Sequence, residues 1–187
     1  MESSKQYTAF CESARIAAGE LESMLSQVWT YLQNRPHNTV IIFDDQTGNQ
    51  ADFDFQGPLE EVLRKALPAE PKTGAGRPKL GIRCREICLL PGQWQWLEEQ
   101  PRNASSTLRR LVHDAMKHES AEDRVKREIA SVGKFMWTMT GDMPGFEEAS
   151  RALYAGDWSL LSDLIATWPK DIKTYLSTMI LRIKEIK

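Results

Sequence analysis

A stretch rich in proline and glycine divides this chain and limits how it can fold. Between residues 68 and 81, six prolines and glycines interrupt any helical or strand periodicity. We therefore predict a linker at residues 68–82 between a unit at residues 1–67 and the rest of the chain. The chain has 187 residues, of which 41% are hydrophobic, which is enough apolar mass for one or two globular domains.

Residues 1–67 are predicted to form a small α+β unit. Leu21, Met24, Leu25, Val28 and Leu32 recur at helical spacing, which predicts an amphipathic helix over residues 20–33 that lies on a sheet. Pro58 opens a shorter helix that runs to residue 67. Four β-prone runs are expected as strands: residues 7–10, 15–18, 39–43 and 51–55.

No metal site is expected. Asp44, Asp45, Asp52 and Asp54 surround a predicted hairpin turn, and carboxylates suit hard cations, but acids beside a turn are more often a solvated face. The cysteines have no CxxC spacing and no histidine at ligand spacing, so we expect neither zinc nor a disulfide and read all three as free thiols: Cys11, Cys84 and Cys88.

Residues 119–187 are predicted to form a helical C-terminal region. Helices are expected at residues 120–140, 146–155, 158–168 and 171–186, with a turn at residues 141–145. The aromatic residues of this region could line a ligand pocket, but aromatics at helical spacing more often belong to a core. On that basis six aromatics are expected inside: Phe135, Trp137, Phe146, Tyr154, Trp158 and Trp168.

Charge is distributed unevenly along the chain, although the net charge is only −2. Residues 1–70 hold 5 Lys/Arg against 11 Asp/Glu, residues 71–118 hold 9 against 4, and residues 119–187 hold 10 against 11. A basic middle segment is a modest electrostatic footprint for a polyanion such as double-stranded DNA.

The start of the basic segment resembles a DNA-binding arm. Residues 76–79 read Gly-Arg-Pro-Lys, which is similar to the core of an AT-hook. Such an arm can lie in a narrow minor groove and bring Arg77 and Lys79 to phosphate or to the groove floor. The alternative is a solvated linker whose charges only keep it in solution.

The segment that follows resembles the ribbon-helix-helix family of DNA-binding modules. A β-prone run at residues 83–90 ends in Leu90-Pro91, and two helices are expected at residues 92–100 and 104–118. The apolar side chains that the resemblance places on the inner faces of the helices are Trp94, Leu97, Leu108, Leu111, Val112 and Ala115. A single copy cannot cover a lone strand, so the resemblance implies a homodimer over residues 83–118.

In that family the paired strands read base edges, and backbone N–H groups at the start of the second helix donate to a DNA phosphate. The resemblance therefore assigns DNA contacts to Arg83, Arg85, Asn103, Ser105 and Ser106. Asn103 is equally expected as a simple helix cap. The strand departs from the family pattern because one of its faces carries Cys84, Glu86 and Cys88, and this departure puts base reading in doubt.

The chain as a whole resembles a bacterial family classed as a domain of unknown function. The matching stretches are residues 7–10, 43–45, 76–81, 89–97, 141–146 and 155–157. The resemblance implies a bacterial cytosolic protein and brings no assigned activity. A cytoplasmic location also fits the polar N-terminus and the lack of any apolar run long enough to cross a membrane.

The sequence leaves two functions open, both on an α+β fold with a ribbon-helix-helix-like centre. The first is a dimeric DNA-binding transcriptional regulator, with a protein or small-molecule effector acting at the N-terminal or C-terminal unit. The alternative is a protein–protein assembly factor that uses the same module only for pairing. An enzyme is not expected, and no cofactor, because His37, His113 and His118 lack partners at catalytic spacing.

Overall fold

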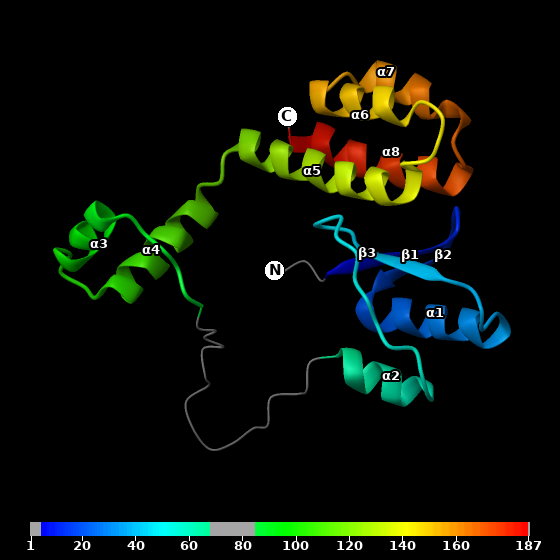
Figure 1. Ribbon diagram of the computed structural model, residues 1–187, viewed down its shortest axis with the longest axis horizontal. Helices are drawn as coiled ribbons and strands as arrows, with labels where there is room; N and C mark the ends of the chain where they lie inside the picture. The colour runs from blue at the N-terminus through cyan, green and yellow to red at the C-terminus, as the bar shows by residue number, and fades with distance from the viewer. Residues whose placement is uncertain (1–4, 68–84, 187) are drawn as a thin grey trace. The chain divides into compact units, whose positions relative to one another are not determined.

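The computed structural model describes residues 5–67 and 85–186 (Figure 1). Its contacts divide the chain into two units: unit 1, Met1–Ala69 with Ala121–Lys187, and unit 2, Glu70–Ser120. The sequence separated residues 1–67 from residues 119–187, whereas the structure packs these two segments together. Unit 2 is therefore an insertion within unit 1.

Unit 1 combines a small antiparallel sheet with helices, which confirms the predicted α+β class. The strand order is β2-β1-β3. The strands are β1 (Gln6–Cys11), β2 (Ala14–Glu20) and β3 (Val40–Asp44). The helices are α1 (Leu21–Asn34), α2 (Leu59–Ala66), α5 (Ala121–Thr140), α6 (Phe146–Ala155), α7 (Trp158–Leu164) and α8 (Lys170–Ile186), with a 3-10 turn at Ile165–Thr167. None of the helices in the described ranges is both long and apolar enough to cross a membrane.

The sheet is covered by helices on both faces (Figure 1). Ala9 and Ile42 pack with Met24, Leu25 and Val28 of α1, as the sequence predicted for this helix. The next residue on each strand points to the other face, because side chains alternate along a strand. Phe10 and Phe43 accordingly belong to a second cluster, which they share with α5, α6, α7 and α8.

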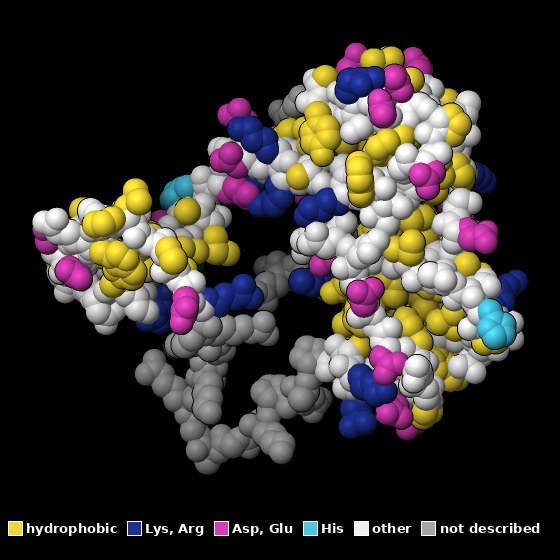
Figure 2. All heavy atoms as spheres, viewed as in Figure 1, with side chains coloured by type: hydrophobic (Ala, Val, Ile, Leu, Met, Phe, Trp, Pro, Cys, Tyr) yellow, Lys and Arg dark blue, Asp and Glu magenta, His cyan; other side chains and the backbone are white. Residues whose placement is uncertain are grey.

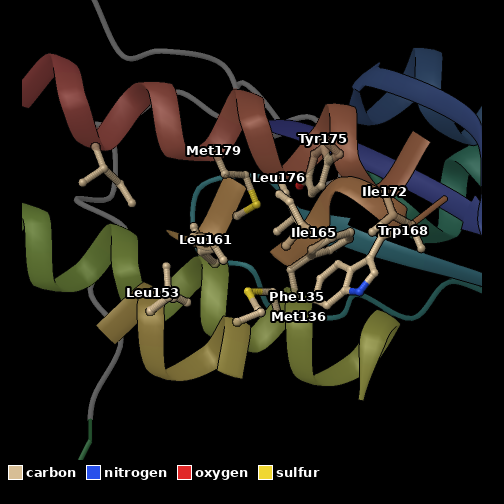
Figure 3. Close-up of a cluster of buried hydrophobic side chains, with 14 of the residues drawn as sticks. Phe135, Met136, Leu153, Leu161, Ile165, Trp168, Ile172, Tyr175, Leu176 and Met179 are labelled. Atoms are coloured by element: carbon tan, nitrogen blue, oxygen red, sulfur yellow. The ribbon is translucent and has the colours of Figure 1, made fainter. Parts of the chain in front are cut away.

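Four aromatic rings join the sheet to the C-terminal helices. Phe135 of α5 lies with its ring centroid 5.5 Å from Phe10, 5.0 Å from Phe43 and 4.7 Å from Tyr175 of α8. The three phenylalanines are completely buried. Figure 3 shows how Phe135 and Tyr175 continue into the aliphatic core between α5 and α8. This cluster connects residues that lie more than a hundred positions apart in the sequence.

A polar contact set at the end of β3 reinforces the same junction. The Tyr175 hydroxyl donates to Asp45 Oδ1 at 2.7 Å, and Thr8 Oγ1 donates to Asp45 Oδ2 at 3.1 Å. Arg182 Nη1 donates to the Asp45 carbonyl oxygen at 2.8 Å. Burial, together with the negative charge of Asp45, raises the pKa of Tyr175 well above its ordinary value near 10. Asp45 therefore holds β1, β3 and α8 together.

Two expectations for the hairpin region were wrong. Residues 51–55 form no strand, because their pairing with β3 stops at the Phe43–Gln50 bridge and the bond from Ala51 N to Ile42 O. Phe53 and Phe55 instead pack against the α1 side of the sheet. Asp44 is also not part of a solvated face, since it is buried and its Oδ1 accepts from the backbone of Gln46 and Thr47.

The C-terminal aromatics divide into buried and exposed groups. Phe135 and Trp168 are buried, as expected, and Trp168 Nε1 donates to the Pro144 carbonyl oxygen at 3.1 Å. Trp137 and Tyr154, however, are 74% and 63% exposed. Each residue directly follows a buried one, Met136 on α5 and Leu153 on α6, and one helical step of about 100° turns both rings away from the core.

Replacing Phe135 by Ala is expected to lower the free energy of unfolding of unit 1 by about 3–5 kcal/mol, because the cavity would lie between three rings that cannot close over it. Urea unfolding measures the change. Leu181→Ala on α8 is the control and should cost about 0.5 kcal/mol or less, since Leu181 is exposed. Equal effects of the two substitutions would contradict the proposed position of Phe135.

The hydrogen bond between Tyr175 and Asp45 should make stability sensitive to alkaline pH. The pKa of Tyr175 is raised in the folded state, so its contribution is complete below pH about 10 and disappears as pH rises further. The free energy of unfolding should therefore fall above pH 10 more steeply in the wild type than in Tyr175→Phe. Identical pH dependence in the two proteins would show that the phenol is not held neutral by the fold.

Candidate nucleic-acid interface

The described part of unit 2 is a hairpin of two helices, α3 (Pro91–Glu98) and α4 (Ala104–Lys117). Pro91 occupies the first turn of α3, where no backbone donor is needed, and Gln93 Oε1 accepts from the Leu90 N–H at 2.9 Å. Asn103 caps α4, its Oδ1 accepting from the Ser106 N–H at 2.8 Å. Both helices agree with the sequence prediction to within three residues at each end.

The predicted strand does not form in the single chain. Residues 85–90 belong to neither a helix nor a strand, and residues 83 and 84 lie outside the described ranges. The physical reason is that a strand needs a hydrogen-bonding partner, which the ribbon-helix-helix arrangement takes from a second copy. One chain offers no such partner within the described part of unit 2.

Unit 2 buries very little of its own apolar surface. Within residues 85–120 only Leu97 and Thr107 are buried. Figure 2 shows hydrophobic side chains gathered on the surface over α3 and α4. The large exposed ones are Ile87, Leu90, Trp94, Trp96, Leu111, Val112 and Met116. Leu111, Val112 and Met116 lie on one side of α4, and Trp96 lines a groove together with Leu111; we call these four residues the apolar face of unit 2. A hairpin with so small a core needs further burial to be stable.

A shallow groove runs along the apolar face between the two helices. It has a volume of about 300 Å³ and is lined by Leu89, Trp96, Leu97, Leu108 and Leu111, together with Gly92 and Gln93. On α4 the apolar positions 108, 111, 112, 115 and 116 follow helical spacing, so they form one continuous stripe. The hairpin therefore presents a surface that another apolar element could cover.

The residues predicted to touch DNA are placed only in part. Arg77, Lys79 and Arg83 lie outside the described residues, and Arg85 is exposed before α3. Asn103 acts as the helix cap, which satisfies the N–H of Ser106.

Ser105 lies in the first turn of α4 and is in contact with the guanidinium group of Arg109. Its backbone oxygen accepts from Arg109 Nε at 3.1 Å, and its Oγ lies 3.3 Å from Arg109 Nη2. The structure thus brings Asn103, Ser105 and Ser106 together at one helix start.

Three arginines that the sequence did not single out surround this helix start. Arg102 precedes the cap, and Arg109 and Arg110 lie one to two turns into α4. All three side chains are exposed, and Arg102 and Arg110 line the same small hollow with Thr107. The adjacent pair at positions 109 and 110 on the polar side of an amphipathic helix was the signal that could have identified them.

Side chains that could bind a metal ion do not gather in the described chain. In residues 5–67 and 85–186, no three His, Cys, Asp or Glu side chains converge as a metal site would require. Cys11 and Cys88 are free thiols, the first buried and the second exposed, whereas Cys84 lies outside the described residues. The helix start of α4 and the apolar face therefore remain the features with a functional geometry in unit 2.

If the apolar face of unit 2 pairs with a second copy, Val112→Glu should abolish pairing. Val112 is 56% exposed in the single chain, so the substitution leaves the hairpin intact but buries an unpaired charge in the dimer. We expect the dimer Kd to rise by about a hundredfold or more. Sedimentation velocity at micromolar concentration measures this. Lys117→Glu, on the opposite side of α4, is the control and should stay dimeric, and a monomeric wild type would contradict the pairing.

Comparison with known proteins gives the chain a family. No curated protein and no solved structure matches it. A family described as "Uncharacterized protein conserved in bacteria (DUF2239)" matches residues 6–180, nearly the whole chain, and this confirms the full-length resemblance. The ribbon-helix-helix resemblance of residues 83–118 stays a prediction. The chain belongs to this bacterial family, whose match extends across both units.

Proposed function

We propose that this protein is a dimeric DNA-binding protein that acts as a transcriptional regulator, with unit 2 as both its pairing and its DNA-binding module. The observation that carries the proposal is the α3–α4 hairpin, which leaves its apolar face uncovered and has arginines around the start of α4. A basic stretch precedes this hairpin in the sequence. Pairing and phosphate binding thus have separate surfaces on one small element.

The energetics of the hairpin support the proposed dimerisation. Burial of apolar surface contributes roughly 25 cal/mol per Å², and a unit with two buried side chains recovers little of this alone. A second copy offers the same stripe on α4 and the same groove beside Trp96, so a symmetric interface would cover both. In such a pair, residues 85–90 could also find the partner strand that the single chain lacks.

DNA contact is supported by the start of α4. A helix N-terminus favours anions, and Arg102, Arg109 and Arg110 add three exposed positive charges close to it. Asn103 already caps Ser106, so a phosphate there would be bound by the arginines and the Ser105 side of the turn. Such contacts position a protein on a duplex without reading its sequence, and Arg77, Lys79, Arg83 and Arg85 would supply further contacts.

A protein–protein assembly factor is the second candidate, and the charge of residues 85–120 favours it. Residues 85–120 hold five Lys/Arg and five Asp/Glu, so the hairpin itself is neutral. Glu98 and Glu99 lie at the end of α3, shortly before Arg102. A neutral module with a large apolar face suits protein pairing, and the excess of positive charge is then confined to residues 72–83.

The basic stretch provides the experiment that separates the two functions. Replacing Arg77 and Lys79 by Gln should reduce the slope of log affinity against log salt by about one unit for each phosphate that the protein no longer neutralises. Fluorescence anisotropy with a labelled duplex of random sequence, titrated at several salt concentrations, measures the slope. Thermal stability should stay unchanged if these side chains serve binding alone.

A matched control removes the same charge elsewhere. Lys170→Gln with Lys184→Gln changes two exposed lysines of α8 in unit 1, and this variant should bind duplex DNA with the wild-type salt slope. If both double variants reduce the slope equally, only the net charge matters and the arm has no special role. If the wild type shows no salt-dependent binding while remaining a dimer, the assembly function replaces the regulator.

A further inference from the structure

A groove on unit 1 has the chemistry of a peptide-binding site and plays no part in the proposed DNA contact. It lies where α5 and α6 pack together, and it exposes the aromatic rings of Trp137 and Tyr154. Large aromatics that are more than half exposed are costly to leave in water and often mark interaction surfaces. Figure 2 shows hydrophobic side chains at the surface over α5 and α6, with acidic side chains nearby.

Two rings form a corner at the centre of the groove. Trp137 and Phe146 have centroids 6.0 Å apart and planes inclined by 63°, so their faces meet at an angle. Together they line a hollow of about 950 Å³ that continues along the α5–α6 loop past Met139 and Met143. The face of an indole ring is the best aromatic partner for an organic cation.

The charged side chains of this hollow are all acidic. Asp142, Glu147 and Glu148 line it, and no Lys or Arg of the described chain does so. Arg151 pairs with Glu148 at 2.8 Å and lies 3.9 Å from Glu147, which neutralises part of this charge. Among the described residues no ion pair is formed by Asp142. Carboxylates beside exposed aromatic faces favour a cationic group over a neutral or an anionic one.

The groove continues beyond the corner into a second hollow of about 630 Å³, which shares Trp137, Thr138 and Phe146 with the first. Its other walls carry the amides of Asn49 and Gln50 and the hydroxyls of Ser150 and Tyr154. Such groups can hydrogen bond to the backbone of an extended chain. Lys134 is also present, but its ammonium already donates to Asn49 Oδ1 at 2.9 Å and to the Thr47 carbonyl oxygen at 3.4 Å.

We propose that this groove binds a basic peptide segment of a partner protein, with an arginine or lysine side chain in the corner between Trp137 and Phe146. The carboxylates of the first hollow would attract the cationic side chain. The hydroxyls and amides of the second hollow would hydrogen bond to the adjoining peptide backbone. The length of the two connected hollows suits a peptide better than a small free cation, which would use the corner alone.

A direct test uses fluorescence anisotropy with a labelled Gly-Arg-Gly-Lys-Gly-Arg-Gly peptide and no DNA. Trp137→Ala should raise the Kd about threefold to thirtyfold, because the variant has no indole face for the cation. Asp142→Asn should also raise it. The same peptide with Gln in place of Arg and Lys should not bind. Thermal melting should be unchanged in both variants, since Trp137 and Asp142 are exposed.

Matched controls distinguish binding of the peptide at this site from nonspecific electrostatic or hydrophobic binding elsewhere on the protein. Glu22→Gln removes an exposed acid from α1, and Leu181→Ala removes an exposed apolar side chain from α8. Both should bind the peptide as the wild type does. Equal weakening by Glu22→Gln and Asp142→Asn would overturn the proposal, because binding would then follow net charge.

Two other occupants of the groove can be identified by the same assay. If arginine amide binds as tightly as the peptide, the site takes a small cation and the peptide proposal is wrong. If Trp137→Ala changes the sedimentation coefficient of the protein itself, the groove is covered by a second copy and the proposal is also wrong. These results are independent of unit 2, so they hold whether or not the protein binds DNA.

Discussion

The three-stranded sheet depends on being covered from both sides. Its strands carry apolar side chains on each face, so α1 alone could cover only the face of Ala9 and Ile42. The other face, with Phe10 and Phe43, is completed by Phe135 and Tyr175 from the last third of the chain. The N-terminal strands and C-terminal helices therefore have to fold as one body, and contacts of such long sequence separation favour slow, cooperative folding.

This constraint explains the position of unit 2. Because α2 and α5 belong to the same body, residues 70–120 leave unit 1 and return to it, which makes them an insertion. An insertion can carry a function without contributing to the host core, and the α3–α4 hairpin has only two buried side chains of its own. A partner surface would add the apolar burial that this hairpin lacks, and this is the basis of the pairing that we propose.

The individual helices could be predicted from the sequence, but the packing between segments that lie far apart in the sequence could not. Helical spacing located α1, the resemblance of the central segment located α3 and α4, and Asn103 was correctly expected as the cap of α4. Residues 51–55 have a strand-like pattern, yet they lack a neighbouring strand and pack through Phe53 and Phe55 instead. Trp137 was expected in the core, but it lies one helical step, about 100°, beyond the buried Met136 and is exposed.

The candidate site was predictable to a similar degree. Asn103 was expected as a helix cap, and Ser105 was identified through the ribbon-helix-helix resemblance. Arg109 and Arg110 gained significance only when α4 brought them beside the same helix start.

If unit 2 pairs two chains and places them on DNA, the mass of the protein–DNA complex will reveal it. Sedimentation of the protein mixed with a labelled duplex at low salt gives this mass, because the chain contributes 21.3 kDa per copy. We expect two chains per duplex, with the complex dissociating as salt is raised. A complex with one chain per duplex, or free DNA beside a stable protein dimer, would contradict it.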